Sequence, residues 1–192
     1  MINRPIRIAI SGAAGTGKST LAEAIAKQLR IGFIPEGVRE WFTKNDKNFK
    51  TMTPEDFMMM QHDLLGEKIN LEACLVNFIV DCSTAEGAAY VLRWSSRTIS
   101  EYEVKVYVNK CREHCSTYDL ICFLPRSIPL VDDGVRSSND NYNYSMNCMI
   151  KGVLTDWGIP YYTVRSTTLE DRIYECVLAY RIMDKKIKEG LA

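Results

Sequence analysis

The sequence IRIAISGAAGTGKST, residues Ile6–Thr20, decides the fold. Its glycine-rich part, Gly12–Ser19, fits the pattern G-x-x-x-x-G-K-[ST], the phosphate-binding loop of proteins that use nucleoside triphosphates. An apolar run at Ile6–Ile10 precedes the loop and predicts a buried strand. Apolar residues at helical spacing follow it in Leu21–Leu29 and predict a helix. The motif therefore sits between a strand and a helix, which is the context that it requires.

The residues of this loop have distinct predicted roles. Gly12, Gly15 and Gly17 let the backbone turn tightly and approach an anion closely. The backbone amides then point at phosphate from the positive end of the following helix. We expect Lys18 to reach the β- and γ-phosphates and Ser19 to ligate Mg²⁺. The expected nucleotide-binding residues are Gly12, Ala13, Ala14, Gly15, Thr16, Gly17, Lys18, Ser19 and Thr20.

Length and composition narrow the class of protein. The 192 residues favour a single domain that spans residues 1–192. Lys+Arg and Asp+Glu both number 24, and this neutral balance argues against nucleic acid as a partner, although a local basic patch would still allow DNA binding. No apolar run approaches the roughly 20 residues of a membrane span, and the first residues read as a strand rather than a signal peptide. The seven scattered cysteines indicate reduced thiols and a cytoplasmic protein.

Predicted strands alternate with predicted helices along the whole chain. After the first strand, we expect short buried strands at 32–35, 75–80, 120–124 and 161–164. Helices are expected to begin near 53, 85, 100, 141 and 168, and residues 43–52 are expected to form a loop. This alternation predicts an α/β domain whose parallel sheet is covered by helices on both faces. Because ligands of such sheets bind at the carboxyl ends of the strands, the residues just after each strand are the candidates for a site.

Two carboxylates follow predicted strands. Asp81 follows the run LVNFIV, and we expect it to hold a Mg²⁺-bound water beside Ser19. It could instead accept a proton from the acceptor, or cap the next helix. Glu36 could orient or deprotonate a hydroxyl, and Arg39 could bind an acidic part of the acceptor, unless the two form only a surface ion pair. We therefore expect the acceptor to enter beside Glu36, Arg39 and Trp41.

Residues 125–138, rich in Pro, Asp, Ser and Arg, are expected to form a mobile lid. Phosphoryl transfer gains from positioned positive charge and from the exclusion of water. Arg126 and Arg136 are the predicted catalytic cations of this lid. Asp132 and Asp133 are expected to hold these arginines or to contact the acceptor. The alternative is an ordinary charged surface loop.

Several stretches together resemble the NadR-like AAA-type P-loop ATPase/kinase family. They are the phosphate loop, Ile34–Glu40, Val80–Ser83 with Ala88–Tyr90, and Tyr118–Leu120 leading to Pro129–Ser137. That family includes nicotinamide riboside kinases and relatives of nucleoside and nucleotide kinases, with versions in phages. The resemblance implies a five-stranded parallel sheet in the order 2-3-1-4-5, and ATP with Mg²⁺ as the phosphate donor. Many members have Asp-Arg-Ser where this chain has Asp81-Cys82-Ser83, so the resemblance does not imply which acceptor is used.

Motifs and resemblance together predict an ATP-dependent kinase. It would transfer the γ-phosphate to a hydroxyl or phosphate of a nucleoside- or nucleotide-like acceptor. The expected catalytic residues are Lys18, Asp81, Glu36, Arg136 and Arg126. One alternative is a phage-type kinase of hydroxymethyl-pyrimidine bases in DNA, and another is a nucleotide-dependent regulatory ATPase without a small-molecule acceptor. The sequence leaves open the acceptor and whether the protein forms a homodimer.

Overall fold

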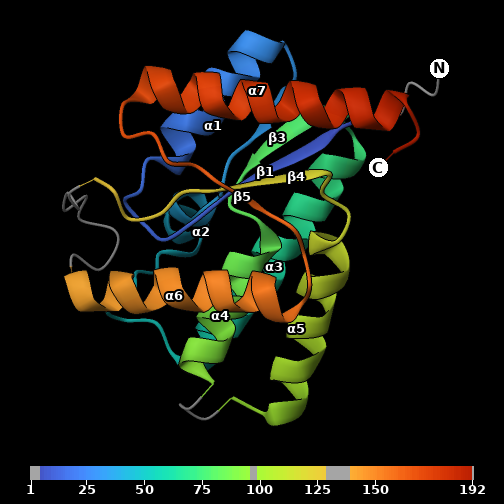
Figure 1. The fold of residues 1–192 in the computed structure, drawn as a ribbon. Helices are drawn as coiled ribbons and strands as arrows, with labels where there is room; N and C mark the ends of the chain where they lie inside the picture. The colour runs from blue at the N-terminus through green and yellow to red at the C-terminus, as the bar shows by residue number, and fades with distance from the viewer. Residues whose placement is uncertain (1–4, 96–98, 129–138, 192) are drawn as a thin grey trace.

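The computed structural model describes residues 5–95, 99–128 and 139–191. Its centre is a parallel sheet of five strands in the order β2-β3-β1-β4-β5 (Figure 1). The strands are β1 (Arg7–Ser11), β2 (Gly32–Ile34), β3 (Phe78–Asp81), β4 (Leu120–Phe123) and β5 (Tyr162–Thr163). The predicted fold class and strand order are therefore confirmed, and the strand that leads into the phosphate loop lies in the middle of the sheet.

Helices cover both faces of the sheet (Figure 1). They are α1 (Lys18–Leu29), α2 (Val38–Asn45), α3 (Pro54–Ala73), α4 (Thr84–Trp94), α5 (Glu101–Cys115), α6 (Asp140–Asp156) and α7 (Leu169–Lys188). On one face, α1 packs against α7, while on the other α4 packs against α3, α5 and α6. Among the described residues, no helix is both long and apolar enough to cross a membrane.

The alternation of side chains along β1 divides the core into two layers. Ile8 and Ile10 are fully buried in the layer that contains Leu21 of α1 and Val177 of α7. Ala9 points to the opposite face and belongs to the layer formed with α3 to α6. Both layers are apolar, so β1 is covered on both sides, as expected for the central strand of a parallel sheet.

Two element boundaries differ from the sequence-based expectations. Strand β3 begins at Phe78 rather than at Leu75, because Leu75 and Val76 lie in the exposed turn that follows α3. Helix α2 continues to Asn45, so the loop that was expected from residue 43 begins later. Apolar residues in a turn and polar residues on a short helix both mislead a prediction based on hydrophobicity.

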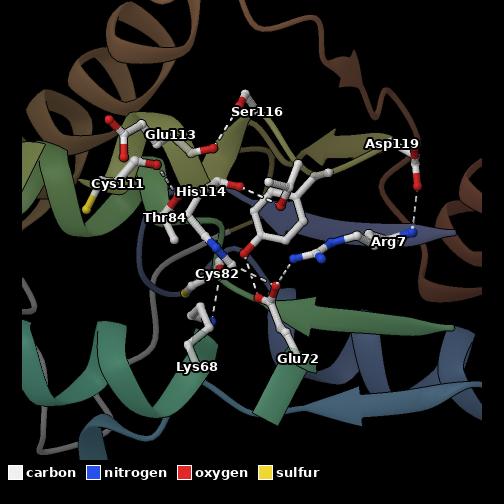
Figure 2. Close-up of polar contacts among 12 residues, drawn as sticks. Arg7, Lys68, Glu72, Cys82, Thr84, Cys111, Glu113, His114, Ser116 and Asp119 are labelled. Carbon is white, nitrogen blue, oxygen red and sulfur yellow. Dashed lines mark hydrogen bonds and ion pairs between the residues drawn. The ribbon is translucent and has the colours of Figure 1, made fainter. Parts of the chain in front are cut away.

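A buried polar network lies away from the phosphate loop, where α3, α5 and the start of β1 meet (Figure 2). Glu72 accepts hydrogen bonds from Arg7 at 2.7 Å and from the Tyr118 hydroxyl at 2.8 Å, and its Oε2 lies 2.8 Å from Nε2 of His114. Burial alone would raise the pKa of Glu72, but the contacts with His114, Tyr118 and Lys68 outweigh burial and hold this pKa below its usual value. The carboxylate therefore stabilises this part of the fold in its charged form.

Candidate active site

The phosphate loop connects β1 to α1 and depends on glycine at defined positions. The backbone φ angles of Gly12, Gly15 and Gly17 are 144°, 74° and 87°, in a region that favours glycine. A Cβ atom added to Gly12 would lie only 2.5 Å from the carbonyl oxygen of Leu124, so a side chain there would collide with the segment after β4. The loop conformation is therefore available only to the glycine pattern that the sequence contains.

Lys18 begins α1, and its side chain folds back over the phosphate loop. Its Nζ donates a hydrogen bond of 2.8 Å to the carbonyl oxygen of Ala13, and the Thr16 hydroxyl donates to the same oxygen at 2.9 Å. Lys18 is buried, whereas Ser19 and Thr20 are exposed at the start of α1. The structure thus brings the predicted nucleotide-binding residues together around one loop, with a single buried amine held against it.

Glu86 is a residue of this site that the sequence reading missed. Its Oε1 accepts a hydrogen bond of 2.9 Å from the backbone N–H of Gly12, and its Oε2 accepts one from the Ser83 hydroxyl. Burial raises the pKa of Glu86, although the charge of Lys18 and these hydrogen bonds lower it in part. Glu86 therefore anchors the first residue of the phosphate loop to α4. The signal was present as a lone acid within the small apolar residues of Ala85–Ala89.

The ends of β2 and β3 place three chemical groups side by side. Parallel pairing aligns Ile34 with Val80, so Glu36 and Asp81 emerge at the same edge of the sheet. The Cys82 thiol donates a hydrogen bond to Oε1 of Glu36 at 3.2 Å, and its Sγ lies 3.8 Å from Oδ1 of Asp81. Burial raises the pKa of this thiol well above its usual value, so the sulfur keeps its proton as a donor. Cys82 thus holds the Glu36 carboxylate in place.

Lys68 supports this edge of the sheet from α3. Its Nζ donates hydrogen bonds to the backbone carbonyl of Asp81 at 3.1 Å and to that of Cys82 at 2.9 Å. Figure 2 shows the second of these bonds. Burial lowers its pKa, while the nearby acidic groups act in the opposite direction. Cys82 has a φ of 69°, which is unusual for a residue other than glycine. The buried amine fixes the two carbonyls that flank this strained position.

The residues present fit a magnesium ion. Ser19 offers an exposed hydroxyl at the start of α1, and Asp81 offers a carboxylate at the end of β3, beside β1. Oxygen ligands of this kind are the ones that Mg²⁺ prefers, with its remaining positions taken by phosphate oxygens and water. Ser83, rather than Asp81, caps α4, since the Ser83 side chain accepts a hydrogen bond from Ala85. The alternative of Asp81 as a helix cap is therefore wrong.

A cavity of about 700 Å³ opens beside the phosphate loop. Its near end is formed by Glu36, Cys82 and Ser83. From there it runs between α3 and α4, and its lining residues share one face of each helix: Phe57, Met60, Gln61, Leu64, Leu65 and Lys68 on α3, and Thr84, Glu86, Gly87, Tyr90, Arg93 and Trp94 on α4. The volume lies within the range of roughly 300–1,000 Å³ that is typical of small-molecule sites.

The cavity is mainly apolar and aromatic, with polar groups at few points. The rings of Phe57 and Trp94 are stacked, with centroids 4.7 Å apart. The Tyr107 hydroxyl donates to Oε1 of Gln61 at 3.1 Å, which leaves the Gln61 amide hydrogens for another partner. A Cβ atom on Gly87 would lie 2.6 Å from the Tyr107 hydroxyl, so glycine keeps this middle part open. The arrangement suits a flat ring with a hydrogen-bond acceptor on its edge.

Several residues that the sequence predicted for the acceptor site or for catalysis do not line the cavity. Arg39 is exposed and does not line the cavity. Trp41 is packed in the core, where its indole N–H donates to Asp63 at 2.9 Å, and it does not line the cavity either. Arg126 is hydrogen-bonded to Asp140 at the start of α6. Asp132, Asp133 and Arg136 lie outside the described residues, as does most of the predicted lid.

Arg172 on α7 is a second residue that the sequence reading missed. Its guanidinium donates to the carbonyl oxygen of Thr16 at 2.9 Å, to that of Ser166 at 2.9 Å and to the hydroxyl of Ser127 at 2.7 Å. The side chain is buried, and among the described residues its hydrogen-bond partners are two carbonyls and a hydroxyl rather than an acid. Arg172 therefore ties the phosphate loop to the segments that follow β4 and β5. No local pattern in the sequence distinguishes it from other charged residues of α7.

The chain is similar to known proteins in its sequence profile and in its fold. The sequence profile of the AAA domain family matches residues 7–172. The crystal structure of NadR protein in complex with NR is 18% identical, with a TM-score of 0.65 over 84% of this chain and 46% of that chain. Deoxyadenosine kinase from M. mycoides with bound dATP is 19% identical, with a TM-score of 0.67 over 92% of this chain and 99% of that chain. Thymidylate kinase from Candida albicans is 16% identical, with a TM-score of 0.63 over 94% of each chain.

At these identities the likeness concerns the fold, which is that of P-loop kinases. The chain spans about half the length of the NadR chains, of which it covers 46% and 50%. None of the curated proteins matches the sequence significantly.

Proposed function

This chain belongs to the AAA domain family, and on that premise we propose that it is an ATP-dependent kinase of a nucleoside- or nucleotide-like acceptor. The observation that carries the proposal is the cavity that adjoins the phosphate loop. Ala14 of the loop and Glu36, Cys82 and Ser83 line one end of it, so the expected donor site and the cavity for an acceptor adjoin each other. A regulatory ATPase has no need of an aromatic cavity beside its γ-phosphate position.

In the proposed reaction the acceptor hydroxyl oxygen attacks the γ-phosphorus of ATP. The bond from that phosphorus to the bridging oxygen breaks, and ADP leaves with the electron pair. The hydroxyl proton passes to Glu36, which we prefer to Asp81 as the base because Glu36 lines the cavity and Asp81 does not. Lys18 and the loop amides neutralise the phosphates. Mg²⁺, held through Ser19 and Asp81, would offset charge on the β- and γ-phosphate oxygens.

The lid arginines complete the proposal. Arg126 would exchange its hydrogen bond with Asp140 for one with a phosphate oxygen. Arg136 would close over the transferring group. An arginine at this position increases the rate of phosphoryl transfer by about 10³–10⁵-fold. Asp133 is proposed to hold one of these arginines or to contact the acceptor. The cavity itself supports Gln61 and Tyr107 in place of Arg39 and Trp41 as the residues that contact the acceptor.

A transfer screen with γ-labelled ATP tests the proposal. The acceptors are nucleosides, nucleoside monophosphates, nicotinamide riboside and DNA that contains hydroxymethyl-pyrimidine bases. We expect label on a small molecule with the wild-type protein, and a loss of at least about 10²-fold in Lys18→Ala. Lys27→Ala is the matched control, because Lys27 is an exposed residue of the same helix that pairs with Glu23.

Each other result identifies a different function. Label on the DNA alone would indicate a kinase of modified bases. Label only in inorganic phosphate would indicate a regulatory ATPase, and equal transfer by Lys18→Ala would contradict the assigned site.

A further inference from the structure

The charged residues of the cavity are segregated between its two ends. At the near end the acids Glu36 and Glu86 line the wall, and Glu86 accepts hydrogen bonds from Gly12 and Ser83. The amine of Lys68 is occupied by the carbonyls of Asp81 and Cys82. The far end is formed by Phe57 and Trp94, and Arg93 directly precedes Trp94 in α4. Lys50 precedes the start of α3, the end of that helix that carries Phe57, and both cations are exposed and line the cavity. Within the described residues, neither cation side chain has a hydrogen bond or ion pair. The far end therefore has a positive charge that no acid among the described residues pairs with.

Contacts between α3 and α4 fix the distance between these ends. The two helices run in opposite directions along the cavity, because Lys68 of α3 is bonded to Cys82, just before α4, whereas Phe57 is stacked on Trp94 at the end of α4. The eleven residue steps from Phe57 to Lys68 correspond to about 16 Å at 1.5 Å per residue. A nucleoside whose hydroxyl reaches Glu36 would leave part of this length unfilled.

The two cations come from independent parts of the chain. Arg93 lies in the last turn of α4, where a basic residue also suits the helix dipole. Lys50 lies in the connection between α2 and α3, where that explanation does not apply. Both nevertheless line the same cavity in a protein whose formal net charge is zero. Two cations that converge on the open end of an aromatic cavity are typical of a site for a phosphate group next to a stacked ring.

We propose that the far end is a second anion subsite, and that the acceptor carries a phosphate at the end opposite its accepting hydroxyl. This inference rests on the proposed kinase function. The ring of the acceptor lies between Gln61 and the stacked pair of Phe57 and Trp94, and the distal phosphate contacts Lys50 and Arg93. The phosphate is either the monoester of a free nucleotide or a diester within a single strand, since both offer the same oxygens to the two cations.

The test compares each of the four deoxynucleosides with its 3′-monophosphate and with a short single-stranded oligonucleotide. Phosphate transfer is measured for the wild type, Lys50→Gln, Arg93→Gln and the double variant. We expect kcat/KM to favour the 3′-phosphorylated acceptors, and this preference to fall about tenfold for each cation removed. Lys44→Gln is the matched control, because Lys44 is exposed on α2 and does not line the cavity. It should keep the full preference.

Binding measured by calorimetry, with a non-hydrolysable ATP analogue present, separates this inference from the proposed function. If no acceptor is phosphorylated, the kinase proposal fails. Tighter binding of the 3′-monophosphate than of the nucleoside, lost in the double variant, would still support the subsite. Equal KM values or equal binding for the two acceptors would overturn the subsite, even if transfer occurs. A steep salt dependence with the oligonucleotide would identify the strand as the source of the phosphate.

Discussion

Glu86 and Glu72 are both buried carboxylates, but their surroundings move their pKa values in opposite directions. Burial is the main cause of the raised pKa of Glu86. For Glu72, the contacts with its partners outweigh burial and lower the pKa. A carboxyl group whose pKa is raised in the folded state stabilises the fold fully at a pH below its unfolded-state pKa. This stabilisation is lost as the pH rises through the folded-state pKa. A carboxyl group whose pKa is lowered in the folded state stabilises the fold at a pH above its unfolded-state pKa. This stabilisation is lost as the pH falls through the folded-state pKa. The two residues therefore give two pH dependences of opposite sign.

For Glu86, we predict that the stability of the wild-type protein falls as the pH rises above 4.5, and that the Glu86→Gln variant does not show this fall. The unfolded carboxyl titrates near 4.5, so the wild-type protein should lose stability as the pH rises from there through the higher folded pKa, by at most about 1.4 kcal/mol per pH unit. Glutamine is neutral and keeps an acceptor for the Gly12 N–H. Urea unfolding between pH 5 and 8 measures this. Parallel curves for wild type and variant would contradict the predicted pKa direction, and the exposed Glu40→Gln serves as a control.

For Glu72, we predict the opposite behaviour on acidification. The wild-type protein should lose stability as the pH falls below about 4.5 through the lower folded pKa, because protonation weakens the contacts with Arg7 and His114. Glu72→Gln should be less stable at pH 7 and should show a smaller acid-induced loss. Thermal unfolding from pH 3 to 7 checks this. Glu67→Gln, an exposed residue of the same helix, should follow the wild type.

At the scale of elements, α7 contributes to the site although it lies on the far face from the cavity. Arg172 joins this helix to Thr16 of the phosphate loop through a buried guanidinium. We predict that Arg172→Met lowers the free energy of unfolding by about 2 kcal/mol, because the buried Thr16 carbonyl and the half-buried Ser166 carbonyl lose their donor. Urea unfolding measures this change. Arg181→Met, exposed on the same helix, should change stability by less than about 0.5 kcal/mol, and an equal loss in both variants would show that the network contributes nothing specific.

The elements were predictable from the sequence where a local pattern specifies them. Gly12–Ser19 identified both the central strand and the nucleotide site, because its glycines serve a backbone conformation that other residues avoid. Glu86 and Arg172 could not be found in this way, since their partners Gly12 and Thr16 lie 74 and 156 residues away. Their roles depend on which elements become neighbours.

The acceptor cavity was the least predictable part of the site. On α3, the helix face that lines the cavity carries Gln61 and Lys68 among its apolar residues, whereas Leu71 of the same helix is exposed, so hydrophobic periodicity does not identify the cavity face. Trp41 attracted a functional interpretation because it follows Glu36 closely, yet its helix turns it into the core. Which face of a helix meets a cavity is decided by packing between elements and not by composition.

At the scale of the whole molecule, the distribution of thiols gives a further prediction. All seven cysteines are free, and Cys74 and Cys148 are the exposed ones. Burial raises the pKa of the Cys111 and Cys115 thiols to about 12, so these form little of the reactive thiolate. We expect a thiol reagent such as DTNB to modify two cysteines quickly in the folded protein and all seven in denaturant. Rapid reaction of more than two would contradict the buried positions.

The central place of β1 has a consequence for how the protein is made. β1 pairs with β3, which begins at Phe78, and with β4, which begins at Leu120. Translation must therefore reach the end of β4 at Phe123 before the strand that precedes the phosphate loop has both neighbours, and Gly12 packs closely against Leu124, which follows β4. A nascent chain that stalls before β4 leaves at least one edge of this apolar strand without its partner. The strand that leads into the phosphate loop is thus translated before both of its neighbours and waits for them to complete the sheet around it.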